Sequence, residues 1–277
     1  MLDTIAQETL RPPRLQRARG VGRITAKARD GRSVIDTLYQ EGCAKIRVPK
    51  PQGTWLDAVL INSSGGLTGG DGVLWSAEAS QHTHLVVTTQ ACERVYRSVG
   101  GSARVSSKLT IDKGARLDWL PQETILFDGA ELERRLDVEM AADATFLGLE
   151  AVIMGREARG EDALSARLKD DWRVRRGGVL VHAEASRLDA NCLVARNNVA
   201  LLYGARAYAT LCYVAADAER QIGPVKALLE GAENAGASRI GEKLVVRILA
   251  ESGYRLRKII MPVIAQFAGA VPKLWTL

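Results

Sequence analysis

Closely spaced cysteines are missing from this chain. Its four cysteines are scattered through 277 residues with no close pair, and they are interpreted as mostly buried thiols: Cys43, Cys92, Cys192 and Cys212. This spacing fits neither a disulfide framework nor a zinc ribbon. Aromatic residues are also few, at 5%, which argues against a platform for stacking single-stranded nucleic acid.

Long uncharged runs and targeting signals are missing as well. Glu150 and Arg206 interrupt the two most apolar segments, so no stretch approaches the length needed to span a membrane. Residues 1–10 contain Asp3 and Glu8 and lack a basic start followed by an apolar block, as a secretory signal would require. We therefore expect a soluble, cytoplasmic protein with no membrane partner.

Apolar and basic residues are plentiful. Hydrophobic residues make up 47% of the chain, enough for a substantial core, and the net charge is +6. Residues 11–32 contain many arginines and lysines but a single acid, Asp30. Such a run is typical of a solvated surface or a docking patch for an acidic protein, with a nucleic-acid arm as the less favoured alternative. The apolar residues interleaved with it, Ile24 and Val34 among them, indicate a strand.

A glycine-rich stretch at residues 62–71, Asn-Ser-Ser-Gly-Gly-Leu-Thr-Gly-Gly-Asp, predicts a tight loop of special backbone shape. Asp71 stands where a phosphate-binding loop needs a lysine, and Trp75 stands where a dinucleotide fingerprint needs its third glycine. Ser63 and Ser64 lack the flanking glycines of a nucleophile elbow. The loop is therefore interpreted as architectural, and Asp71 is its one ionisable group.

Most of the chain alternates between apolar and polar residues with the period of a strand. The expected strands, separated by turn signals and without intervening helices, predict an antiparallel, mainly β body; they lie near residues 43–48, 55–61, 73–79, 83–89, 105–111, 135–140, 145–154, 164–174 and 179–183. Residues 145–154 are almost continuously apolar, which suits a strand buried on both faces.

The last third of the chain has helical periodicity. Helices are expected from Asp217 to about Gly231, over residues 241–250 and over residues 252–268, with a kink or break at Pro262. We expect a single domain over residues 1–277, with a basic N-terminal segment of about 1–22 and a helical C-terminal part of about 217–270.

Two histidines and several acid-bearing turns are the candidates for chemistry. His82 and His84 are two apart in an expected strand and would share one face, which is possible metal-ligand geometry. Glu123 and Asp128 lie in an otherwise apolar stretch, and Glu161 follows Gly160 near Arg156. Turn, edge-strand and ion-pair roles are the simpler interpretation of these acids, and no catalytic motif is recognisable.

Six distinct segments follow one another in a specific order along the chain: residues 42–49, 62–71, 88–97, 117–129, 154–161 and 272–275. In this order they resemble the UreD family of urease accessory proteins, called UreH in some bacteria. The resemblance covers nearly the whole chain, except for the basic start before Arg23, and it is loose in the helical tail. Pro262 interrupts a region where relatives usually have an unbroken helix.

The resemblance implies a fold and a function. The fold would be mainly β, with two packed sheets in a β-helix-like stack and a small C-terminal helical region. The protein would be a nickel-insertion chaperone and not an enzyme, binding apo-urease and UreF, through which it meets the GTPase UreG. Nickel would be in transit through an internal channel, with no tightly bound cofactor.

A conduit for nickel would use oxygen atoms that hold the ion weakly. The candidate lining residues are Asp71, Thr88, Glu123, Asp128 and Glu161, with transient binding at His82 and His84 as a further possibility. Two alternatives stay open. A β-rich hydrolase would lose turnover through a single acid-to-amide change, and a nucleic-acid-binding module would bind with a steep salt dependence.

Overall fold

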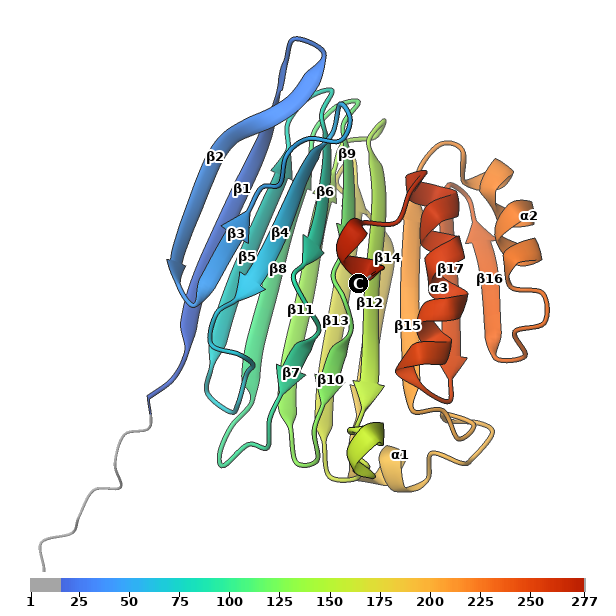
Figure 1. Cartoon of the computed structure of the whole chain (residues 1–277). Helices are drawn as coiled ribbons and strands as arrows, with labels where there is room; N and C mark the ends of the chain where they lie inside the picture. Colours follow the sequence, from blue (N-terminus) through green and yellow to red (C-terminus); the bar gives the residue numbers. More distant parts are fainter. Residues whose placement is uncertain (1–15, 277) are drawn as a thin grey trace, which may run out of the picture.

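Two β-sheets face each other, and a helical region covers one of them (Figure 1). The computed structural model describes residues 16–276. The seven-stranded sheet has the order β14 (Val179–Leu188), β13 (Arg167–Arg176), β11 (Glu131–Met140), β8 (Ala103–Ile111), β5 (Gly72–Ala79), β1 (Arg19–Arg29) and β2 (Arg32–Gly42).

The second sheet has ten strands. Its order is β16 (Ala235–Ile240), β17 (Lys243–Ala250), β15 (Ala207–Val214), β12 (Thr145–Met154), β9 (Arg116–Leu120), β6 (His84–Thr89), β4 (Leu56–Asn62) and β3 (Ala44–Arg47). The short strand β10 (Thr124–Leu126) also pairs with β12, and β7 (Glu93–Val95) pairs with β10. The helices are α1 (Ala190–Val194), η1 (Glu157–Arg159), α2 (Ala218–Leu228), α3 (Gly253–Ala268) and η2 (Lys273–Trp275).

The chain alternates between the two sheets as it advances from β4 to β13. Strands β5, β8, β11 and β13 pair in parallel in one sheet, and β4, β6, β9 and β12 pair in parallel in the other. The expected antiparallel body is therefore wrong for the centre of both sheets, although the outer pairs β1/β2, β3/β4, β13/β14 and β12/β15 are antiparallel. Parallel neighbours need a return path, and here the strand in the opposite sheet provides it. The two-sheet, β-helix-like stack is confirmed.

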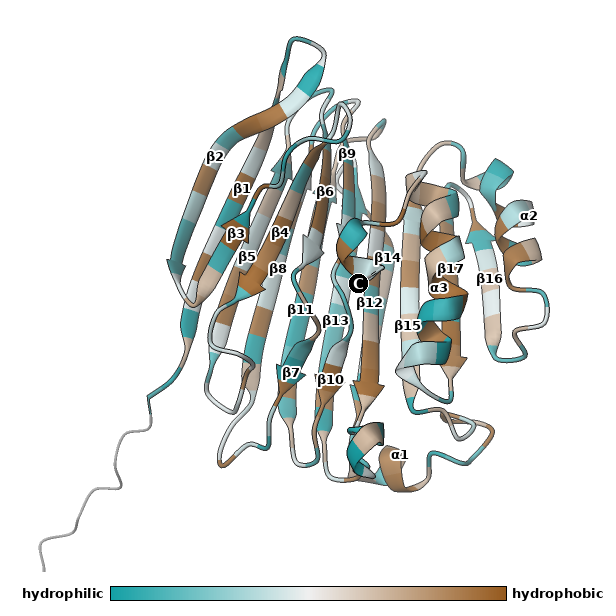
Figure 2. Ribbon diagram, viewed as in Figure 1, coloured by the Kyte–Doolittle hydropathy of each residue, from teal (hydrophilic) through white to brown (hydrophobic). Residues whose placement is uncertain are grey.

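The alternating sequence pattern creates two apolar layers. Figure 2 shows apolar and polar residues alternating along many of the strands. Inward-facing residues of both sheets form one core, and the other face of the ten-stranded sheet forms a second core with α2 and α3. Strand β12 supplies Phe146 to the first core and Leu147 to the second, which confirms that this strand is buried on both faces.

The C-terminal part differs from the expectation in one element. Residues 243–250 form strand β17, which pairs with β15 and β16, instead of the expected helix. Its burial alternates with period two, because Leu244 and Val246 pack in the second core and Val245 packs against the first. The other two expected helices are confirmed as α2 and α3.

Helix α3 runs from Gly253 to Ala268 without a break at Pro262. Ser252 caps its start by accepting a hydrogen bond from the backbone N–H of Arg255. The apolar residues on both sides of Pro262, including Ile260 and Val263, are fully buried against the sheet. This packing offsets the hydrogen bond that proline cannot donate. Over residues 16–276, no helix is both long and apolar enough to cross a membrane.

Candidate functional site

The glycine-rich loop has the tight backbone expected from its sequence. Gly65, Gly66 and Gly70 adopt positive φ, and a Cβ added at Gly69 would lie 2.3 Å from the carbonyl oxygen of Gly101. Asp71 is buried at the end of the loop, where its carboxylate accepts hydrogen bonds from the backbone N–H groups of Ala18 and Thr68, both at 2.8 Å. Asp71 therefore fixes the loop against the start of the seven-stranded sheet.

Thr88 and Glu123 lie on the face of the ten-stranded sheet that the helices cover. Leu85 and Val87 of the same strand face the other sheet, which places Thr88 on the opposite side. The Thr88 hydroxyl is buried and has no hydrogen-bond partner among the described residues. Glu123 is fully buried, and its carboxylate accepts hydrogen bonds from Nε and Nη2 of Arg257 on α3, at 2.7 and 2.8 Å.

Cys92 joins the Glu123 contact. Its Sγ lies 3.3 Å from Oε2 of Glu123, and burial raises the pKa of this thiol to about 11. Arg257 also contacts the carbonyl oxygen of Trp275, whose indole N–H donates to Leu120. The network ties α3 and the end of the described chain to the sheet.

Asp128 and Glu161, far apart in sequence, come together at a hollow of about 480 Å³. The backbone N–H of Asp128 donates to Glu161 at 3.2 Å. Asp128 also accepts hydrogen bonds from Ser165, which is the main reason that its pKa is lowered, and Glu161 has its pKa lowered chiefly by its hydrogen bond from Arg156. Both acids are thus held in the ionised form at a surface that solvent reaches.

His82 and His84 do not share a strand face, contrary to the expectation. His82 lies in the turn before β6 with a φ of 57° and sits against Gly114. His84 begins the strand, and its Nε2 lies 2.9 Å from Oδ2 of the buried Asp118. The positive φ at His82 ends the extended backbone that would have aligned the two rings.

An ionic cluster that was not predicted from the sequence lies between the two sheets. Arg134 on β11 contacts Glu150 on β12 at 2.5 Å and Asp170 on β13 at 2.6 Å. It also donates to the hydroxyl of Thr124 at 3.1 Å, while the indole N–H of Trp119 donates to Glu150 at 3.1 Å. All of these side chains are buried. Burial raises the pKa of Glu150 to about 7, although the charge of Arg134 opposes this.

A signal for this cluster is present in the sequence. Arg134 replaces an apolar residue between Leu132 and Leu136, and Asp170 occupies the same kind of position between Leu168 and Trp172. Each charge therefore stands on the inward face of its strand. Two such opposite charges on neighbouring strands predict a buried ion pair, and Glu150 in an apolar strand supplies the third member.

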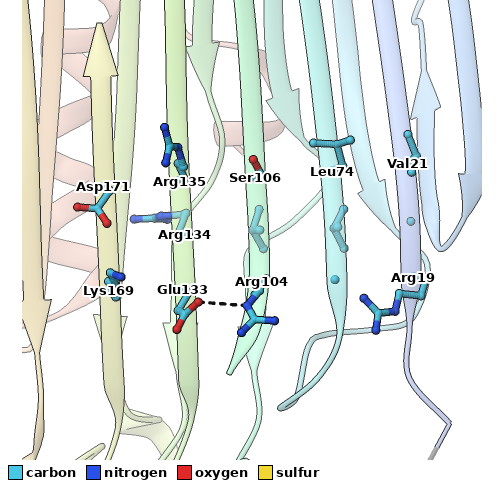
Figure 3. Close-up of a pocket in the computed structure, with 14 residues that line it drawn as sticks. Arg19, Val21, Leu74, Arg104, Ser106, Glu133, Arg134, Arg135, Lys169 and Asp171 are labelled. Atoms are coloured by element: carbon cyan, nitrogen blue, oxygen red, sulfur yellow. Dashed lines mark hydrogen bonds and ion pairs between the residues drawn. The ribbon is translucent and has the colours of Figure 1, made fainter. Parts of the chain in front are cut away.

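The outer face of the seven-stranded sheet has a separate hollow of about 540 Å³ (Figure 3). Its floor includes Val21, Leu74 and Ser106, and Arg104 pairs with Glu133 at 3.1 Å along one side. Five basic and two acidic residues line it: Arg19, Arg104, Arg134, Arg135, Lys169, Glu133 and Asp171. Because α2 and α3 pack on the other sheet, this face is exposed and carries an excess of positive charge.

The arrangement of donors suits weak contacts with a cation. Within residues 16–276, no three side chains of histidine, cysteine, aspartate or glutamate gather as a metal site. Carboxylates are instead paired with arginine or with backbone N–H groups, as at Glu123 and Asp71. Isolated oxygen donors of this kind bind divalent ions less tightly than a histidine and cysteine cage.

Comparison with known proteins identifies the family. The family profile described as "UreD urease accessory protein" matches residues 18–276. The chain is 52% identical over 274 residues to a protein of Chelativorans sp., covering 98% of this chain and 99% of that one. It is 49% identical to a protein of Rhizobium etli, over 99% of this chain and 100% of that one. Both relatives carry the name "Urease accessory protein UreD", and the chain belongs to the UreD family of urease accessory proteins.

Proposed function

We propose that this protein is a chaperone for nickel insertion into apo-urease, acting as a scaffold and nickel conduit together with UreF and the GTPase UreG. The observation that carries the conduit is the ionic cluster of Arg134, Glu150 and Asp170 between the sheets. Membership of the urease accessory family supplies the metal and the target. In this role the chain binds and passes an ion and performs no catalysis.

The position of the cluster supports this proposal on energetic grounds. Burying a charged side chain costs several kcal/mol of desolvation, of which an ion pair returns only part, so an apolar core would serve folding at least as well. Two carboxylates facing one guanidinium leave an excess of negative charge in the interior when both are ionised. Such a charge lowers the energy of a divalent cation between the sheets.

The five candidate residues fit the conduit to different degrees. Asp128 and Glu161 are ionised, adjacent and open to solvent at their hollow, so we assign them to the capture of nickel at the surface. The Thr88 hydroxyl, which has no hydrogen-bond partner among the described residues, can serve as a neutral oxygen donor. The carboxylate oxygens of Asp71 accept hydrogen bonds from backbone N–H groups, and those of Glu123 accept them from Arg257. We therefore assign these two residues to shaping the walls of the conduit.

The scaffold needs a surface for its partners. The exposed outer face of the seven-stranded sheet, with Arg19, Arg135 and Lys169 around its hollow, fits an acidic protein surface. The same positive charge would also favour nucleic acid, but no element of this face is arranged as a groove-reading helix or an aromatic platform within the described residues. We therefore favour a protein partner.

Reconstitution tests the proposal. Apo-urease, UreF, UreG, GTP, nickel and bicarbonate are combined with or without this chain, and urease activity is measured while size exclusion follows complex formation. Activity that appears only when the chain is present, with the chain in the complex, supports the proposal. If the chain stays outside the complex and activation is unchanged, the chaperone function is wrong, and the hydrolase alternative is tested by a substrate screen.

A further inference from the structure

A small pocket of about 260 Å³ lies beneath the glycine-rich loop. Trp75 of the seven-stranded sheet and Leu60 of the ten-stranded sheet both line it, and both belong to the core between the sheets. The pocket therefore opens into the space between the sheets. Asn62, Gly65 and Gly66 of the loop form its rim on one side, and Thr89 and Glu93 form the other.

Glu93 is the acidic group of this pocket. Val95 on the same strand faces the core, so Glu93, two residues earlier, points to the same side. Its two carboxylate oxygens accept hydrogen bonds from Nδ2 of Asn62, at 3.2 and 3.1 Å. Desolvation dominates the environment of the carboxylate and raises its pKa to about 7.

Glu93 is half-buried and differs from the fully buried acids in its partners. Glu123 pairs with Arg257, Glu150 and Asp170 pair with Arg134, and Asp118 pairs with Arg116. Within residues 16–276, Glu93 forms no ion pair, and a neutral amide is its only side-chain partner. The charge of the neighbouring Arg94 and a hydrogen bond from its backbone act in the opposite direction to desolvation, but desolvation is the larger effect. A desolvated carboxylate without an ion-pair partner attracts either a proton or a cation.

The pocket is continuous with the ionic cluster through neighbouring strands. Glu93 is directly opposite Thr124 in the parallel pair β7/β10, and such neighbours are separated by about 4.8 Å between strands. The hydroxyl of Thr124 accepts a hydrogen bond from Arg134. A line of inward polar groups thus runs from Asn62 and Glu93 to Thr124 and Arg134.

We propose that this pocket binds one hydrated divalent cation, with Glu93 as its anionic ligand and the oxygens of the glycine-rich loop and bound water as the others. The volume allows this, since a water molecule occupies about 30 Å³ and small divalent ions commonly keep several waters. The identity of the ion as Ni²⁺ rests on the proposed function. The glycine-rich loop thereby becomes a part of the binding site as well as a structural turn.

Two substitutions test the pocket in opposite directions. Glu93→Gln keeps the shape and removes the charge, whereas Asn62→Asp adds a second carboxylate. Binding of Ni²⁺ to the full chain without a histidine tag is measured by calorimetry, and binding of Co²⁺ by its visible absorption. We expect Glu93→Gln to weaken binding about tenfold or more and Asn62→Asp to tighten it severalfold, because ligand charge sets affinity for hard cations.

Glu133→Gln is the matched control, because Glu133 is an exposed carboxylate on the outer face of the other sheet. It should leave binding unchanged. The proposal is overturned if the wild-type chain binds neither ion, or if Glu93→Gln binds as tightly as wild type. Should Glu93→Gln fail to fold, as judged by circular dichroism, Asn62→Asp decides: unchanged or weaker binding overturns the pocket.

The same variants separate this pocket from the proposed function. If the wild-type chain activates urease but binds no Ni²⁺, the Glu93 site is refuted and the chaperone role still stands. If Ni²⁺ binding depends on Glu93 but the chain has no effect on activation, the site is supported and the chaperone role is refuted.

Discussion

Arg257 on α3 donates hydrogen bonds to both carboxylate oxygens of Glu123, at 2.7 and 2.8 Å. Glu123 lies 134 residues earlier in the chain. Glu123 is 1% exposed at its side chain, and Arg257 is 24% exposed. The pair joins the helix to the segment between β9 and β10 in the middle of the ten-stranded sheet, with Cys92 and Gln122 as further contacts of the same guanidinium. This ion pair therefore adds a polar link to the apolar packing that holds α3 on the sheet.

Replacing Arg257 with methionine should lower the free energy of unfolding by about 3–5 kcal/mol, because it leaves a buried carboxylate without its partner. Chemical denaturation followed by circular dichroism measures this. Arg255→Met is the control on the same helix, since Arg255 pairs with Glu251 at the surface and should contribute about 1 kcal/mol or less. Equal losses for the two variants would show that the Glu123 contact does not hold the helix.

Asp71→Ala should destabilise the protein by about 1–3 kcal/mol, because two backbone N–H groups lose their acceptor. The loss is expected even in the absence of nickel and partners. Thermal unfolding measures it, with Asp36→Ala, which removes an exposed ion pair with Lys27, as the control. An Asp71→Ala chain as stable as wild type that still fails to activate urease would instead assign Asp71 to ion transfer.

Arg134→Met should destabilise the protein by about 3–5 kcal/mol near neutral pH, since Glu150 and Asp170 would be buried without a counter-charge. Without the guanidinium, the pKa of Glu150 should rise further above its ordinary value. The variant would then bind a proton that the unfolded chain releases, so its deficit should shrink as the pH falls. Denaturation at several pH values measures this, and a deficit that is constant with pH would contradict it.

Glu93→Gln should make the chain more stable than wild type at about pH 8 in the absence of metal. The folded pKa of Glu93, about 7, is above its ordinary value of 4.5. Between these values the folded state holds a proton that the unfolded state has released, so the wild-type free energy of unfolding falls as pH rises and levels off above about 7.

The glutamine variant lacks this loss, and its advantage should be about 1–3 kcal/mol at high pH and close to zero near pH 4. Comparing denaturation curves of the two chains across this range isolates Glu93, because the other titrating groups are common to both. An advantage that is absent at high pH, or that grows as the pH falls, would contradict the dominance of desolvation at Glu93.

Much of the fold follows from local pattern. The alternation of apolar and polar residues at Val138 and Met140 identifies the inward face of β11. The apolar run around Leu149 identifies a strand that is buried on both faces. Strand direction could not be obtained in this way, because alternation is the same for parallel and antiparallel neighbours. The error at β17 has another cause, since Leu244 and Ile248 recur at a spacing that suits a helix as well as a strand.

The candidate site could be predicted only in part. Asp128 and Glu161 were both selected from acid-bearing turns, but their contact depends on how β10 and β12 pair. Glu93 was missed because a single charged residue in a polar-looking segment gives no local sign of burial. Arg134 stands at an apolar position of its strand, but its acidic partners cannot be identified from that position alone. Their environment is set by which strand lies opposite, which is a property of the stack.

The double variant Asp128→Asn, Glu161→Gln should slow nickel-dependent activation of urease severalfold while the chain still enters the complex. Both acids are ionised at their hollow, and removing both charges lowers the local concentration of a divalent cation. The matched control is Asp137→Asn, which removes an acid paired with Arg135 on the outer face of the other sheet. Raising the nickel concentration should restore the activation rate of the double variant, because its defect is in capture. A rate that stays low at high nickel would place these acids in a later step, and a rate equal to that of wild type at low nickel would exclude this hollow as the point of capture.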